Sequence, residues 1–319
     1  MAKHRASLLI VSVLAGLAAA CSGGGKPPTA AATAEPAAAA TPAPASSAAQ
    51  VDAALQAAIA GDWRDPENRA RDAARHPRET LEFFGIRPDM AVVEIWPGAG
   101  WYSEILAPYL RDHGRYIAAH WDPEAKQEFF RKGVQGFKDK LAARPDVYGK
   151  AEVVVLALPD KAAMVAPESV DMVVTFRNIH NWMASGKAPE MFAAMYRALK
   201  PGGVLGVVEH RAATDQPQDP KARSGYVRQD FATALAEQAG FVFEAASEVN
   251  ANPRDSKDYP GGVWTLPPTL REGDKDREKY LAIGESDRFT LRFRKPGSVA
   301  GVGEGAAPVS DEEPSPPSP

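Results

Sequence analysis

Short apolar runs alternate with segments of helical periodicity along the middle of the chain, and this alternation limits the fold most. The first five runs cover 90–95, 115–120, 152–157, 170–176 and 204–209. Apolar runs of this length, bounded by turn residues, are typical of buried strands. Helical spacing marks 101–110, 187–199 and 227–239, and two later strands are predicted over 241–247 and 289–293. The alternation predicts a doubly wound α/β fold with a mostly parallel sheet.

Composition excludes several classes of protein and separates the ends of the chain from its middle. With 45% hydrophobic and 24% charged residues, collagen-like, coiled-coil, multi-spanning and wholly disordered chains are excluded. A net charge of −4 argues against a nucleic-acid partner. The Ala/Pro-rich composition of residues 21–50 predicts a flexible tether. The acidic, Pro-rich composition of residues 297–319 predicts a disordered tail. The folded domain is therefore expected over 51–296.

The first 20 residues predict a signal peptide. A basic start precedes an almost wholly apolar run over 6–20, which is too short to span a bilayer comfortably. The run ends in Leu-Ala-Ala-Ala-Cys21, which resembles the lipobox of bacterial lipoproteins. The resemblance implies a cell-envelope lipoprotein that faces the periplasm, with the membrane as a partner through lipidated Cys21. By the same resemblance, Ser22 implies sorting to the outer membrane. A plain cleaved signal with a stray cysteine is the alternative.

The turn after the first predicted strand is the most informative segment. Ligands of such sheets bind beyond the carboxyl ends of the strands. There the chain reads Glu94-Ile-Trp-Pro-Gly-Ala-Gly100, and Gly-x-Gly before a helix lets the backbone approach a ligand closely. A third glycine would complete a dinucleotide fingerprint, but Ser103 stands at that position. A dinucleotide oxidoreductase is therefore a disfavoured alternative.

Three motifs together resemble the class I S-adenosylmethionine (SAM)-dependent methyltransferases over about residues 78–295. They are the Gly98-Ala-Gly100 turn, Ser169-Val-Asp171 and Leu199-Lys-Pro-Gly-Gly203. Four stretches also resemble a group of exported "predicted methyltransferase" proteins: 94–102, 177–182, 209–211 and 286–296. The resemblance implies a Rossmann-like, seven-stranded sheet with an antiparallel last strand. It also implies SAM as the cofactor and methyl transfer to an unknown small-molecule or envelope acceptor.

Two positions depart from the family's pattern at the expected cofactor site. Trp96 stands where the family usually has glycine, and it could either line the cofactor pocket or fill it. The family usually ends its second strand with an acidic residue that holds the ribose. In this chain His120 takes that position, and Asp122 follows two residues later. Both departures favour the main alternative, a non-catalytic envelope binding protein that keeps the fold without SAM. The expected cofactor-binding residues are Glu94, Trp96, Gly98, Gly100, His120 and Asp122.

Polar side chains follow the fourth and fifth predicted strands and could face one pocket. A histidine there could remove a proton from a methyl acceptor, although positioning alone could suffice, and a structural network is a third interpretation. With Glu209, the two histidines could bind a metal. No metal site is predicted, because these ligands lie on separate loops without motif spacing. The candidate catalytic residues are His180, His210, Arg177 and Asn181.

Two segments are expected to cover the same edge of the sheet. Residues 51–88 predict a helical cap in which Arg71 and Arg75 share one helix face. That face could hold an anionic substrate, but a solvated charged face is the favoured interpretation. Residues 248–287 predict a lid-like insertion, because the segment is too long for a simple hairpin. Five tryptophans fall on or beside the loops expected at this edge of the sheet: Trp96, Trp101, Trp121, Trp182 and Trp264. Their aromatic faces could attract a sulfonium cation by roughly 0.5–2 kcal/mol. Alternatively, they only pack the loops against the domain.

Overall fold

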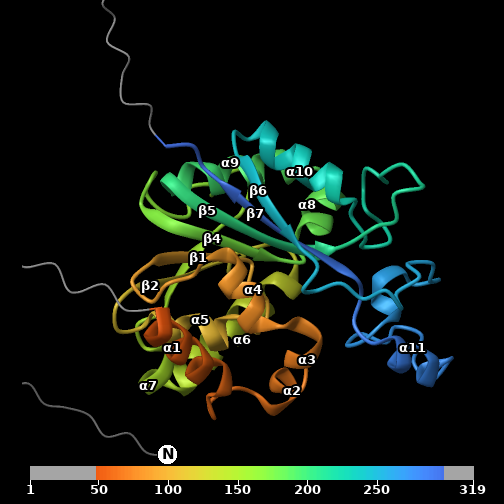
Figure 1. Ribbon diagram of the computed structural model, residues 1–319, viewed down its shortest axis with the longest axis horizontal. Helices are drawn as coiled ribbons and strands as arrows, with labels where there is room; N and C mark the ends of the chain where they lie inside the picture. Colours follow the sequence, from red (N-terminus) through yellow and green to blue (C-terminus); the bar gives the residue numbers. More distant parts are fainter. Residues whose placement is uncertain (1–47, 298–319) are drawn as a thin grey trace, which may run out of the picture. The chain divides into compact units, whose positions relative to one another are not determined.

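The structure, a computed structural model, describes residues 48–297, with side chains described from residue 53 onward (Figure 1). The expected signal peptide, the lipidated Cys21, nearly all of the tether and the acidic tail lie outside the described residues. Within residues 48–297, no helix has the length and apolar character needed to cross a membrane.

A seven-stranded sheet runs through the described domain in the order β3-β2-β1-β4-β5-β7-β6 (Figure 1). Neighbours among β1 to β5 pair in parallel, whereas β7 is antiparallel to both β5 and β6. The predicted Rossmann-like, mostly parallel sheet with an antiparallel last strand, the class I methyltransferase fold, is therefore confirmed. The strands are β1 (Ala91–Ile95), β2 (Arg115–His120), β3 (Glu152–Val155), β4 (Val170–Phe176), β5 (Leu199–His210), β6 (Val242–Ser247) and β7 (Arg288–Arg294).

Helices cover both faces of the sheet because both faces of its central strands are apolar. Along β1, Val93 and Ile95 point to one hydrophobic core and Val92 points to the other, as the two-residue period of a strand requires. The first core includes residues of α8 (Ile179–Ser185), α9 (Ala188–Ala198) and α10 (Gln229–Gln238). The second includes residues of α1 (Ala48–Ala60), α4 (Pro77–Phe84), α5 (Ser103–Leu110), α6 (Glu128–Ala143) and α7 (Pro145–Tyr148).

The charged segment before the sheet differs from its prediction. Instead of one helix that carries both Arg71 and Arg75, the chain forms α2 (Pro66–Arg69), α3 (Asp72–Arg75) and α4. His76 separates the last two because it adopts the left-handed region at φ 43° and Pro77 follows it. Proline removes a backbone donor and begins helices readily, so the break fits the sequence.

Four other elements differ from the prediction. The helix α6 buries Val134, Phe137 and Leu141, whose spacing of three and four residues is a helical signal that the sequence analysis missed. The strand β5 begins at Leu199 and includes the Lys-Pro-Gly-Gly segment, whereas the strand was predicted over 204–209 only. Within the predicted lid, residues 262–265 form the 3-10 helix η1 (Gly262–Thr265), and α11 (Arg277–Ile283) follows.

Candidate active site

A cavity of about 350 Å³ lies at the carboxyl ends of β1 and β4. Its wall combines the turn after β1, the turn after β4, and two segments distant in sequence, Asn68–Arg75 and Val263–Ser286. The cap and lid segments thus both contribute to one cavity. Of the expected site residues, the wall includes Trp96, Gly98, Arg177, His180 and His210, and it does not include Glu94, Gly100, His120, Asp122 and Asn181.

The turn after β1 has the backbone that a close-approaching ligand requires. Trp96, Gly98 and Gly100 have φ values of 46°, 61° and 84°, in the region that favours glycine. A Cβ atom built on Gly98 would meet nothing within 4 Å, so the space above this residue is open. A Cβ on Gly100 would meet the Phe137 ring at 3.0 Å, so Gly100 allows packing against α6. The cradle over Gly98 fits a bound nucleotide-type cofactor.

Trp96 occupies the side of the cavity nearest β2 and β3. Its indole Nε1 donates a hydrogen bond to the Leu156 carbonyl at 3.0 Å, directly after β3. Its ring centroid is 6.2 Å from those of both Trp121 and Trp182. A left-handed tryptophan stores about 1–3 kcal/mol of backbone strain, which this packing and hydrogen bonding must offset. Trp96 therefore both lines the cavity and fills space over the ends of β2 and β3.

Trp121 contributes a second feature that fits a ligand. It lines the cavity beside Trp96, and its buried indole N–H has no hydrogen-bond partner among the described residues. A buried donor without a partner costs about 1–3 kcal/mol, and a ligand acceptor could offset that cost.

Glu94 does not reach the cavity and instead joins the start of α5 to β2. Its Oε2 accepts hydrogen bonds from Ser103 Oγ at 2.8 Å and from the Tyr116 hydroxyl at 2.6 Å. Ser103, which breaks the dinucleotide fingerprint, thus anchors the first turn of α5. Burial raises the pKa of Glu94 to about 7, and the Tyr116 and Ser103 hydrogen bonds only partly oppose that effect.

We expect Glu94 to make stability depend on pH. Because its folded pKa of about 7 lies above the ordinary 4.5, its contribution is complete below pH 4.5 and is lost as pH rises through 7. Glu94→Gln mimics the protonated acid and does not titrate. The fall in the free energy of unfolding between pH 5 and pH 8 should therefore shrink by ~2–3 kcal/mol, measured by urea denaturation. Parallel pH profiles for the two proteins would contradict this assignment.

His120 and Asp122, the two candidates for the ribose, are engaged elsewhere. The Trp121 N–H donates to His120 Nδ1 at 2.8 Å, so Nε2 carries the proton and donates to the Gly98 carbonyl at 3.1 Å. Burial lowers the pKa of His120 to about 4, so the ring is neutral. His120 thus braces the glycine turn. Asp122 forms an ion pair with Lys161 at 2.7 Å.

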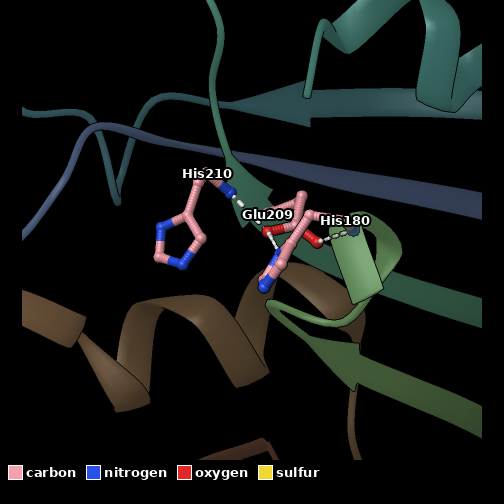
Figure 2. A group of neighbouring side chains, drawn as sticks. All are labelled: His180, Glu209 and His210. Atoms are coloured by element: carbon pink, nitrogen blue, oxygen red, sulfur yellow. Dashed lines mark hydrogen bonds and ion pairs between the residues drawn. The ribbon is translucent and has the colours of Figure 1, made fainter. Parts of the chain in front are cut away.

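Glu209 and the two histidines form a hydrogen-bonded group at the end of β5 (Figure 2). The Glu209 carboxylate is fully buried and accepts three N–H groups: His180 Nδ1 at 3.1 Å, His210 N at 2.8 Å and His180 N at 3.3 Å. Because Nδ1 of His180 donates, its Nε2 carries a free lone pair. A carboxylate that fixes the tautomer of an imidazole is the arrangement of a general base.

His210 is the second imidazole of this group and lies 5.4 Å from His180 between ring centroids. Its Nδ1 shares a hydrogen bond of 2.6 Å with the Ser286 hydroxyl. Burial, followed by the nearness of His180 and Arg177, holds the pKa of His210 well below its ordinary value, so this ring is neutral.

The same three residues could also be read as metal ligands. Each offers one ligand atom, and the three atoms lie within 4.8 Å of one another. Because Nδ1 of His180 donates its proton to Glu209, only Nε2 of this ring could ligate a metal. Both Glu209 oxygens already accept N–H groups. The geometry favours the hydrogen-bonded group.

The turn after β4 separates two asparagines that the sequence could not distinguish. Asn178 is buried, lines the cavity, and donates to the Ile95 carbonyl at 2.9 Å, which ties this turn to the end of β1. Asn181, three residues later in α8, is exposed and does not line the cavity. Asn178, rather than the candidate catalytic residue Asn181, is therefore the asparagine that lines the cavity.

The favoured interpretation of Arg71 and Arg75 as a solvated face is wrong. Arg75 is only 4% exposed, and both residues line the cavity. Both form ion pairs with Glu285, a residue that no sequence pattern singled out. The only signal was its position directly before the Ser286–Pro296 stretch.

The chain is similar to several solved structures, each at a TM-score under 0.5. No family model and no curated protein matches the chain. A SAM-dependent methyltransferase from Aquifex aeolicus is 17% identical over 76% of this chain and 98% of its own, with a TM-score of 0.47. CrArsM, an arsenic(III) methyltransferase from Chlamydomonas reinhardtii, is 15% identical over 77% and 74%, with a TM-score of 0.44. The [4+2]-cyclase SpnF is 14% identical over 77% and 93%, with a TM-score of 0.49.

Proposed function

We propose that this chain is a SAM-dependent methyltransferase whose cofactor lies over the Gly98–Gly100 turn and whose acceptor lies beside His180. One observation carries the proposal: a single cavity joins an open glycine turn to an imidazole oriented by a buried carboxylate. When bound, SAM would supply an electrophilic methyl group on a sulfonium cation. The tryptophan faces on the cavity wall suit such a cation.

The residues around His180 are suited to hold a proton that leaves the acceptor. The lone pair on Nε2 accepts the proton, and the Glu209 carboxylate stabilises the positive charge that then spreads over the ring. Glu209 also accepts both backbone N–H groups of the histidines, so it keeps a fixed position when the charge changes. The neutral His210 is available to hydrogen-bond the acceptor.

His180→Gln is expected to lower methyl transfer by roughly 10²-fold or more, because it removes the proton acceptor. The measurement is the formation of S-adenosylhomocysteine from SAM in the presence of small-molecule fractions of a bacterial envelope extract. His113→Gln, at an exposed position, serves as the matched control. Activity equal to wild type in His180→Gln would mean that positioning alone suffices. Loss of wild-type activity on metal chelation would instead favour the metal interpretation.

A non-catalytic envelope binding protein is the second candidate, and one observation favours it. The Trp96 indole lies over the ends of β2 and β3, in space that the resemblance gives to the nucleoside. A protein that kept the fold without SAM would bind neither SAM nor S-adenosylhomocysteine in calorimetric titration.

We also propose that the protein is exported and anchored by lipid at Cys21, facing the periplasm from the outer membrane. The support is the sequence of the first 22 residues alone. Cys21→Ala should move the protein from the membrane fraction to the soluble envelope fraction, and unchanged membrane association would count against the anchor.

A further inference from the structure

One side of the cavity gathers arginines around a single carboxylate. Glu285 accepts from Arg71 Nε at 2.7 Å, from Arg75 Nε at 3.1 Å and from Arg288 Nη1 at 3.1 Å. Arg75 and Arg288 are 4% and 2% exposed, and Glu285 is 9% exposed. Three guanidinium groups therefore share one negative charge in a poorly solvated place.

Arg177 adds a fourth cation near this group. It follows β4 directly, in the left-handed region at φ 61°, and lines the cavity. Among residues 53–297, its guanidinium makes neither a hydrogen bond nor an ion pair. Burial, and then the nearness of Arg288, lowers the pKa of Arg177.

A second unfilled donor belongs to Arg71. Its Nε is bound to Glu285, whereas its Nη2 is buried and has no partner among the described residues. The guanidinium of Arg75 lies 4.8 Å from the centroid of the Trp101 ring, which holds it in place. The cluster thus combines excess positive charge, fixed geometry and free N–H groups, which are the requirements for binding an oxyanion in a bidentate manner.

We propose that Arg177, Arg71 and Arg75 form a subsite for an oxyanion, a carboxylate or phosphate group, carried by the methyl acceptor. This inference rests on the proposed function. Arg177 directly follows β4, His180 lies three residues later in the first turn of α8, and both line the same cavity. A bound oxyanion would therefore place its neighbouring nucleophile close to His180 Nε2. The acceptor class is then a small anionic molecule with an ionisable nucleophile.

The carboxylate of SAM itself is an oxyanion and is the competing source. The two sources predict different results when the anion and the cofactor are titrated separately. A site for the acceptor binds a free anion in the presence of SAM, whereas a site for the SAM carboxylate is occupied once SAM is bound.

The test uses calorimetric titration of the full chain with inorganic phosphate and with succinate, each with and without saturating SAM. We expect binding of at least one probe under both conditions, and Arg177→Gln should weaken it roughly tenfold or more. Affinity for SAM should stay unchanged in Arg177→Gln. The control is Arg223→Gln, whose side chain is 80% exposed and which should bind the probes as wild type does. A melting temperature near that of wild type verifies the folding of each variant.

Three outcomes would overturn the inference: no binding of either probe to the wild type at millimolar concentration, loss of probe binding when SAM is present, or an equal loss of SAM affinity in Arg177→Gln. The last two would assign the arginines to the SAM carboxylate. Failure of the wild type to bind SAM, with anion binding intact and sensitive to Arg177→Gln, would overturn the proposed function and keep the oxyanion subsite.

Discussion

Gly98→Val is expected to abolish SAM binding while the protein stays folded. Gly98 has a φ of 61°, and the space above it is open for at least 4 Å. A valine side chain would project into the proposed cofactor site. The expected loss of affinity is roughly 100-fold or more, which corresponds to about 3 kcal/mol, measured by calorimetric titration with SAM and S-adenosylhomocysteine.

The chain offers a matched control for this variant. Gly202 has a φ of 79°, and a Cβ atom there would also meet nothing within 4 Å. It lies near the start of β5, outside the cavity wall. Gly202→Val therefore carries a similar backbone strain of about 1–3 kcal/mol without obstructing the cavity. Equal loss of SAM affinity in both variants, or none in Gly98→Val, would contradict a cofactor site over this turn.

Glu285→Gln is expected to lower the free energy of unfolding by about 3–5 kcal/mol, because it leaves buried guanidinium groups without a counter-charge. Burial opposes ionisation of Glu285, yet Arg75, Arg288, Arg71 and Arg177 together lower its pKa to about 2. Its folded pKa therefore lies below the ordinary 4.5. The stability it contributes is complete above pH 4.5 and is lost as pH falls through 2. Urea denaturation at pH 7 measures the effect.

An exposed ion pair provides the comparison for Glu285. Glu82 accepts from Arg78 Nε at 2.9 Å, and both side chains are 44% exposed. Glu82→Gln should cost about 0.5 kcal/mol or less, because water screens a surface pair. Similar losses in the two variants would show that the arginine cluster is solvated in the folded protein. A partial rescue of Glu285→Gln by added phosphate would be consistent with the oxyanion subsite.

The sheet could be predicted because its buried strands are visible in the sequence as short runs of hydrophobic residues. Apolar runs such as 91–95 and 170–176 are buried on both sides, so nearly every residue in them is hydrophobic and the signal is strong. The glycine turn was equally readable, since a left-handed backbone and a close approach both select glycine. Amphipathic α6 carried a weaker signal, because only three of its residues are buried.

The site was only partly predictable, and the reason differs between residues. The sequence left open whether Trp96 lines the cavity or fills it. Trp96 lines the cavity, and its hydrogen bond to Leu156, 60 positions away, holds the indole over the end of β3. His120 and Asp122 matched positions in a family pattern, but their own partners, Gly98 and Lys161, decide what they are free to bind. Neither partner follows from spacing.

The sequence by itself determined the architecture and the edge of the sheet where the cavity lies, because periodicity and turn residues act over a few positions. Only the tertiary structure decided which side chains meet there. Arg71 and Arg75 form hydrogen bonds with Glu285 across more than 200 positions. Arg75 and Glu285 are buried there, whereas the sequence favoured a solvated arginine face. Charges distant in sequence interact strongly only when folding removes the water between them, and no local pattern records that removal.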